Sequence, residues 1–113
     1  MARKNTLTEA PPYAVDRHLK RLGADLRTAR LRRNLTIEEV ARKIGTGPRP
    51  VSDAEKGKPS VSVAVYVALL WTYDLLRQLE SVANPTLDKE GLALATLRER
   101  ERARKKTGLD NDF

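Results

Sequence analysis

Residues 36–57, TIEEVARKIGTGPRPVSDAEKG, contain two short helical patterns separated by a turn with two glycines. In the first pattern, Thr36 and Glu39 have the spacing of a capping box, whose side chains accept hydrogen bonds from free N–H groups at a helix start. Gly45 ends this pattern, because glycine adopts the left-handed conformation at low cost. A helix over residues 36–44 is therefore predicted. Its buried face consists of Ile37, Val40, Ala41 and Ile44.

A second short helix is predicted over residues 48–56. Pro48 is favoured at the first helical position, where its missing N–H would have had no intrahelical partner. Pro50 also lies in the first turn, but it disfavours a helical conformation at Arg49 and is expected to distort that turn. Two short helices joined by a tight glycine-containing turn form a helix-turn-helix arrangement. The inward-facing residues of the second helix are Val51 and Ala54.

The segment before this pair divides into an arm and a long basic helix. Residues 1–13 are polar, contain Pro-Pro and show no periodicity, so we expect a disordered N-terminal arm. From Val15 to residue 33, apolar residues recur at helical spacing. The other faces of this helix carry seven basic and two acidic residues. Its apolar stripe consists of Val15, Leu19, Leu22, Leu26 and Ala29.

Residues 61–71, VSVAVYVALLW, fit either a strand or a helix. Alternating valines favour a strand. We predict a buried helix instead, because a lone strand would have no pairing strand elsewhere in the chain. A helix that is apolar on nearly every face needs a second cover, so a homodimer or partner interface is predicted. The candidate interface residues are Val65, Tyr66, Leu69, Leu70, Trp71 and Tyr73. For Trp71 and Tyr73, core packing is the alternative.

The remaining chain is predicted to be helical as far as a short tail. Residues 75–82 form a fifth helix ended by Asn84-Pro85, and residues 85–106 form a C-terminal basic helix capped by Thr86 or Asp88. Three roles are open for the basic run 98–106: it is a solvated helix face, it adds nonspecific contacts to DNA, or it binds an acidic partner surface. Residues 107–113 are expected to form a flexible acidic tail, which either stays mobile or becomes ordered when it binds a partner. The domain boundaries are therefore 1–13, 14–84, 85–106 and 107–113.

The composition favours nucleic-acid binding over catalysis. A net charge of +7 predisposes a small protein to polyanions. Cysteine is absent and His18 is the one histidine, so a thiolate or histidine metal site and a histidine-dependent triad are not expected. No cofactor, metal or enzyme activity is expected. The longest apolar run has nine residues where a bilayer needs about 20, which predicts a cytoplasmic protein with no membrane partner.

The stretch LGADLRTARLRRNLTIEEVARKIGTGPRPVSDAEKG resembles the Xre/lambda-repressor-type helix-turn-helix domain, with the likeness covering residues 22–76. The resemblance implies an all-α, five-helix domain, here with an extra C-terminal helix, whose third helix enters the major groove of DNA. It also implies a buried ion pair between Arg30 and Glu55. Two exposed, unpaired charges are the alternative.

A narrower likeness concerns the segments DAEKGKPSVSVAVYVALLW and NPTLDKEGLALA, which resemble HipB-like antitoxins. That resemblance implies a homodimeric repressor of its own operon that neutralises a HipA-like serine/threonine kinase toxin. A toxin anchor is the alternative role for Trp71 and Tyr73. A solitary Xre-type repressor and a toxin-binding scaffold with weak or no DNA binding are the alternatives.

The resemblance also assigns DNA-contacting positions, and this sequence departs from the family at several of them. Gly47 replaces the usual Ser or Thr cap, at a cost of a few tenths of a kcal/mol. Arg49 can make a bidentate contact to guanine, and Ser52 also faces bases. Asp53 either accepts from cytosine or is bridged to a neighbouring cation. The candidate phosphate contacts are Thr36, Lys43, Lys56, Lys58, Arg32 and Arg33.

Overall fold

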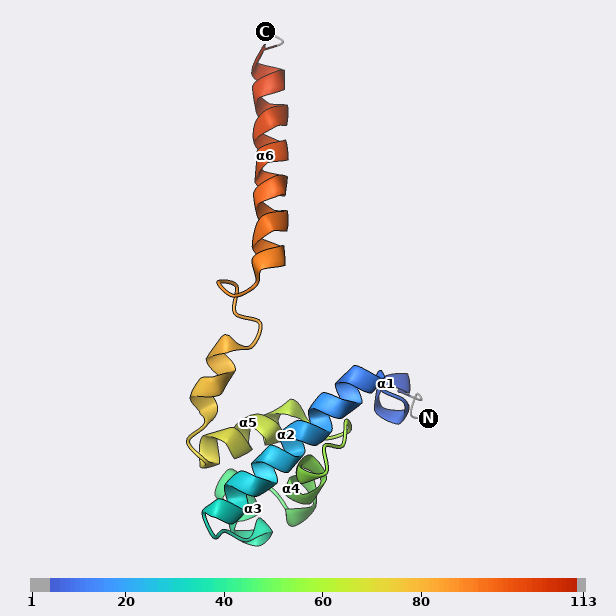
Figure 1. The fold of residues 1–113 in the computed structure, drawn as a ribbon, viewed down its shortest axis with the longest axis vertical. Helices are drawn as coiled ribbons and strands as arrows, with labels where there is room; N and C mark the ends of the chain where they lie inside the picture. Colours follow the sequence, from blue (N-terminus) through green and yellow to red (C-terminus); the bar gives the residue numbers. More distant parts are fainter. Residues whose placement is uncertain (1–4, 112–113) are drawn as a thin grey trace. The chain divides into compact units, whose positions relative to one another are not determined.

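The computed structural model describes residues 5–111, with side chains to residue 108. The first four residues of the expected arm and the last two of the expected tail lie outside this range. The chain divides into two units, Met1–Arg77 and Gln78–Phe113. Within the described range every regular element is a helix, so the predicted all-α class is confirmed (Figure 1). The elements are α1 (Thr6–Glu9), α2 (Tyr13–Arg32), α3 (Ile37–Ile44), α4 (Pro48–Glu55), α5 (Val63–Thr72), η1 (Leu76–Ser81) and α6 (Lys89–Asn111).

Three elements differ from the sequence-based expectation. The single turn α1 lies within the segment expected to be disordered, and the Asn5 side chain caps it by accepting from the backbone N–H groups of Leu7 and Thr8. The predicted fifth helix is a 3-10 helix, η1. The C-terminal helix runs through Asn111, so it continues into the segment that we expected to be a flexible tail.

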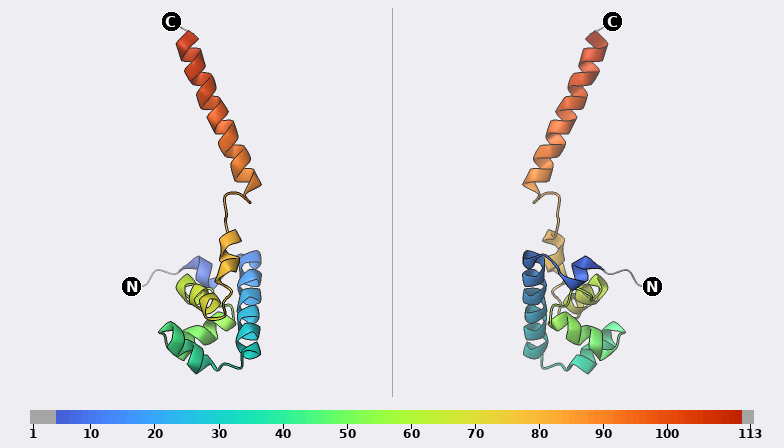
Figure 2. Two further views of the ribbon diagram at one scale, coloured as in Figure 1. Left: turned by 90° about the vertical axis from the view of Figure 1, so that its left-hand side faces the viewer. Right: turned by 90° about the vertical axis from the view of Figure 1, so that its right-hand side faces the viewer.

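The core of the first unit lies where α4 meets its neighbours. α4 contacts α2, α3 and α5, and α3 also contacts α5. Figure 2 shows the long helix α2 to one side of α3, α4 and α5. Val51, Ala54 and Leu69 are fully buried at the centre of this packing. The other buried apolar residues are Leu26, Ala29, Val40, Ala41, Tyr66, Leu70 and Tyr73.

The ends of α3 and the start of α4 follow the local signals in the sequence. Thr36 Oγ1 accepts from the Glu39 N–H, and Glu39 Oε1 accepts from the Thr36 N–H, which completes the capping box. Gly45 ends α3 in the left-handed conformation, with φ at 81°. Gly47 caps α4 and Pro48 is its first residue. Because the first-turn N–H groups have no intrahelical acceptor, the two prolines of α4 remove no helical hydrogen bond.

Two glycines allow α2 to lie directly against the end of α4. A Cβ on Gly23 would lie 2.4 Å from the Ala54 carbonyl oxygen, and one on Gly57 would lie 2.5 Å from the Leu19 carbonyl oxygen. Both neighbouring atoms belong to the backbone, so neither can move aside cheaply. Gly57 also has φ at 68°, a conformation that residues with a Cβ adopt at a cost. The helix-turn-helix is thus held by backbone-to-backbone contact as well as by side chains.

The apolar run 61–71 forms α5, as predicted, but its role as an interface needs correction. Four of the candidate interface residues lie inside the subunit's own core, so they are not available to a second chain: Tyr66, Leu69, Leu70 and Tyr73. Of the other two, Val65 is half-buried and Trp71 is 54% exposed. The N-terminal end of the α2 stripe differs too, since Val15 is exposed.

The second unit is dominated by α6. Asp88 caps this helix, because its Oδ1 accepts from the Gly91 N–H at 3.0 Å. Ion pairs are absent among the side chains of α6 that the structure describes, despite the alternating charges. Within residues 5–111, none of the helices has the length and hydropathy needed to cross a bilayer. Four leucines of this unit are more than half exposed, namely Leu87, Leu92, Leu94 and Leu97.

Tyr73 carries the one buried side-chain polar atom without a hydrogen-bond partner among the described residues. The residue is 1% exposed, and its Oη has no partner. Burial raises the pKa of the Tyr73 phenol to about 12, and the nearby Glu55 charge acts in the same direction. The folded domain therefore holds this phenol neutral at pH values where the unfolded chain would ionise it.

We predict that Tyr73→Phe leaves the free energy of unfolding at pH 7 unchanged or higher, because it removes an unsatisfied buried hydroxyl. The pKa of Tyr73 is higher in the folded state than in the unfolded state, so the wild type keeps its full free energy of unfolding below pH 10. It then loses up to about 1.4 kcal/mol per pH unit as the pH rises toward 12, a loss that the variant avoids. Urea unfolding at pH 7 and from pH 9.5 to 11.5 measures both effects.

The matched control is Tyr13→Phe, at a tyrosine that is 79% exposed. It should reproduce the wild-type dependence on pH. A Tyr73→Phe variant that is clearly less stable at pH 7, or that loses stability above pH 10 as steeply as the wild type, would contradict the prediction.

Candidate nucleic-acid interface

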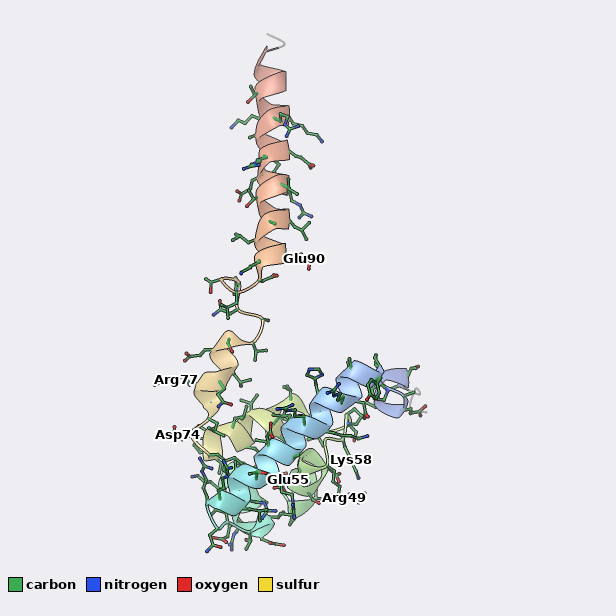
Figure 3. The ribbon with its side chains drawn as sticks, viewed as in Figure 1. Arg49, Glu55, Lys58, Asp74, Arg77 and Glu90 are labelled. Carbon is green, nitrogen blue, oxygen red and sulfur yellow. The ribbon has the colours of Figure 1, made fainter. Side chains whose placement is uncertain are left out.

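The first turn of α4 presents Arg49 to solvent. The opposite face of the helix carries Val51 and Ala54, which are fully buried, so the helix has a fixed orientation in the first unit. The Arg49 side chain is 89% exposed. Ser52 is half-buried beside it. Figure 3 shows Arg49 and Lys58 at the same edge of this unit. An exposed arginine on the outer face of a fixed helix is suited to contact a polyanion.

The ion pair between Arg30 and Glu55 is present. Arg30 Nε donates to Glu55 Oε2 at 2.7 Å and Nη2 donates to Oε1 at 3.0 Å, which is the bidentate geometry. The two side chains are 9% and 5% exposed. Arg30 Nη1 also donates to the Leu35 carbonyl at 2.9 Å. One guanidinium thus joins α2, the end of α4 and the turn before α3. Its hydrogen bond with Glu55 raises the pKa of Arg30, against the opposing effect of burial.

Asp53 lies between two cations. Its Oδ1 is 3.0 Å from Lys58 Nζ, and its Oδ2 is 3.9 Å from Arg49 Nε. Of the two alternatives left open by the sequence, the structure shows the carboxylate bridged to neighbouring cations. The Lys58 N–H also donates to the Asp53 carbonyl at 3.1 Å. The connector after α4 therefore folds back onto the helix and brings Lys58 to Asp53.

Tyr66 holds this connector from α5, a contact that the sequence did not indicate. Its hydroxyl donates to the Lys58 carbonyl at 3.0 Å. Burial raises the pKa of the Tyr66 phenol, and the Asp53 charge adds to the effect. Tyr66 was predicted to be an interface residue. The apolar run that contains it does not indicate that its hydroxyl bonds a loop residue eight positions earlier.

Arg33 has a structural role that its assignment to a phosphate contact did not include. Its Nη1 donates to the Ala29 carbonyl and its Nη2 to the Tyr73 carbonyl, each at 2.9 Å. The guanidinium carbon also lies 5.5 Å from the centre of the Tyr73 ring. Two of its donors therefore tie the end of α5 to α2.

The other candidate phosphate contacts are exposed but differ in how far they are engaged. Arg32 and Lys56 form no ion pair with the side chains described. The Lys43 ammonium lies 5.6 Å from the centre of the Trp71 ring, an attraction across α3 and α5 that the sequence did not suggest. Thr36 Oγ1 accepts from the Glu39 N–H, which leaves the hydroxyl hydrogen free to donate. The basic surface around α3 and α4 is thus partly free and partly held in place.

His18 lies on α2. It is exposed, and its Nδ1 lies 2.6 Å from the Ala14 carbonyl of the preceding helical turn. Among the side chains that the structure describes, three or more His, Asp or Glu residues nowhere gather as metal ligands do.

Comparison with protein families matches residues 21–81 to the family described as a helix-turn-helix domain. This range covers more than half of the chain. Neither the curated proteins nor the solved structures include a match to this chain.

We predict that Glu55→Gln lowers the free energy of unfolding by about 3–5 kcal/mol, because it leaves the buried Arg30 guanidinium without its counter-charge. The control is Asp16→Asn, which breaks the exposed pair with Lys20, 2.8 Å apart on one face of α2. That change should cost less than about 1 kcal/mol. Chemical unfolding of both variants gives the two values, and similar losses in the two variants would show that burial does not strengthen the first pair.

Proposed function

The chain belongs to the helix-turn-helix domain family, and from this premise we propose that it is a sequence-specific, homodimeric transcriptional repressor in the cytoplasm. Helix-turn-helix domains bind DNA through the second helix of the motif, which lies in the major groove. The observation that carries the proposal is the orientation of α4. Its inner face is fixed in the core, and its outer face presents Arg49, whose side chain is 89% exposed.

Phosphate contacts would supply most of the affinity. Lys56 and Lys58 follow α4, while Arg32 and Lys43 lie near the two ends of the α3 region, and all four side chains are exposed. Cations that neutralise phosphates release condensed counterions, so affinity for a duplex falls steeply with salt. The net charge of +7 favours the same partner.

Base contacts would be few. Arg49 matches the two acceptors that guanine exposes in the major groove, and Ser52 can donate to or accept from a base. Asp53 is already bridged to two cations and is not an additional base contact. Sequence selectivity in this proposal therefore depends on Arg49, on the shape of the duplex and on the spacing of two half-sites.

A homodimer would place its two α4 helices about 34 Å apart, on successive major-groove faces of an inverted repeat. Val65 and Trp71 are the members of the predicted interface that are not enclosed in the core. A large aromatic side chain that is half exposed is typical of a contact surface. These two residues are accordingly the part of α5 that we assign to the subunit contact.

A narrower proposal is that the repressor is the antitoxin of a HipA-like kinase. It rests on the resemblance of residues 53–71 and 84–95 to HipB-like antitoxins and on the exposed leucines of α6. A helix with exposed leucines beside a basic run gains stability from a protein surface that covers them. The alternative is a solitary repressor without a toxin partner.

We expect the wild type to bind duplex DNA from its own promoter with an affinity that falls linearly with salt on a double-logarithmic scale. Arg49→Ala should lose about tenfold in affinity for the promoter while binding to random duplexes is nearly unchanged. Arg49→Lys is the matched control for charge: it keeps the cation but lacks the bidentate fork. Equal losses on promoter and random DNA would show that Arg49 contacts only phosphate, and absence of duplex binding at low salt would overturn the repressor proposal.

The antitoxin proposal is tested by expressing the protein together with the product of the neighbouring reading frame. A stable complex and loss of the partner's kinase activity are expected. The matched variant, Leu92→Lys with Leu97→Lys, replaces exposed α6 leucines and should weaken the complex without weakening promoter binding. A neighbouring gene product that is no kinase, or that forms no complex, would leave the solitary repressor.

A further inference from the structure

Asp53 occupies an unusual place for a carboxylate on a helix that approaches phosphates. It lies one helical turn after Arg49, and its side chain is 20% exposed. Each of its oxygens faces a different cation, Lys58 at 3.0 Å and Arg49 at 3.9 Å. An unpaired carboxylate here would repel the DNA backbone. With two cations around it, the group of three keeps one net positive charge, so it does not cancel the basic surface.

Lys58 and the connector hold Asp53 through atoms other than the oxygen that lies nearest to Arg49. The Lys58 ammonium contacts Oδ1, the Lys58 N–H donates to the Asp53 carbonyl, and the Tyr66 hydroxyl donates to the Lys58 carbonyl. Lys58 is thus held at its backbone by α5 and at its side chain by α4. This arrangement leaves Oδ2 as the oxygen of Asp53 that faces Arg49.

The contact with Arg49 involves the nitrogen that guanine does not need. Oδ2 lies nearest to Nε, while the bidentate contact to guanine O6 and N7 can use the terminal Nη1 and Nη2. An arginine that is 89% exposed has many rotamers, and ordering them on binding lowers affinity and selectivity. A carboxylate beside Nε reduces this freedom.

Resting on the function proposed above, we propose that Asp53 is a positioning residue: it orients Arg49 so that the guanidinium fork selects guanine, and Lys58 holds Asp53 in place. Asp53 touches no base itself. The recognition unit of α4 is the chain Lys58–Asp53–Arg49, and guanine is the base that it selects at one position of each half-site.

The test is selection of bound duplexes from a randomised pool, followed by affinity measurements on the enriched site and on its variants at the guanine position. Four proteins are compared: the wild type, Asp53→Asn, Arg49→Lys, and the two changes together. Asp53→Asn is expected to reduce the preference for guanine by about tenfold, within the range of a bidentate arginine contact, and to leave the other positions of the site unchanged. Its affinity for random duplexes should be equal or higher, because a negative charge is removed. In the Arg49→Lys background, Asp53→Asn should change the preference no further.

Thermal unfolding shows whether Asp53→Asn is still folded at the temperature of the assay. Lys58→Gln serves as a second variant, since it removes the cation behind Asp53 without altering α4, and a smaller loss of guanine preference is expected.

Three outcomes would overturn the inference while the repressor proposal stands. Guanine preference could persist in Asp53→Asn, a cytosine preference could be lost instead, or the loss could be equally large in the Arg49→Lys background, which would indicate a merely structural effect. Failure of the wild type to enrich any duplex would refute the proposed function itself, and this inference with it.

Discussion

The bidentate contact between Arg30 and Glu55 fixes the C-terminal end of α4. The surface that we propose to contact DNA, the outer face of α4, depends on this contact. The same guanidinium bonds the Leu35 carbonyl, so one side chain joins α2, the turn before α3 and the end of α4. Gly23 and Gly57 allow the backbones to approach closely enough for this contact. The ion pair holds the C-terminal end of α4, the burial of Val51 and Ala54 holds its inner face, and Arg49 lies on the exposed face.

Local signals predicted the helix-turn-helix well, because each depends on a few neighbouring residues. The capping box at Thr36 and Glu39, the left-handed Gly45 and the proline at the start of α4 are properties of the chain over one or two turns. The prediction of an ion pair between Arg30 and Glu55 rested on family resemblance and not on the spacing of the two residues. A separation of 25 residues carries no geometric information until the fold is known.

The errors concern residues whose role depends on distant packing. The apolar run that forms α5 gave no indication of which faces other helices cover, so Tyr66, Leu69 and Leu70 were assigned to an interface although they form the core, while Tyr73 takes the core position that was left open for it. Arg33 was assigned to DNA because of its charge, and its partner carbonyl lies 40 residues away. For Asp53 the sequence left a base contact and a bridge to a neighbouring cation open, and the bridge to Lys58 depends on how the connector after α4 turns back.

The position of Trp71 gives the domain an internal optical probe. It is the single tryptophan of the chain, it is 54% exposed on α5, and the Lys43 ammonium of α3 lies 5.6 Å from its ring centre. Indole fluorescence responds to a nearby cation and to hydration, so the emission of the unlabelled protein reports the packing of α3 on α5. An emission spectrum can thus detect separation of α3 from α5 at this contact, without a dye attached to the basic surface.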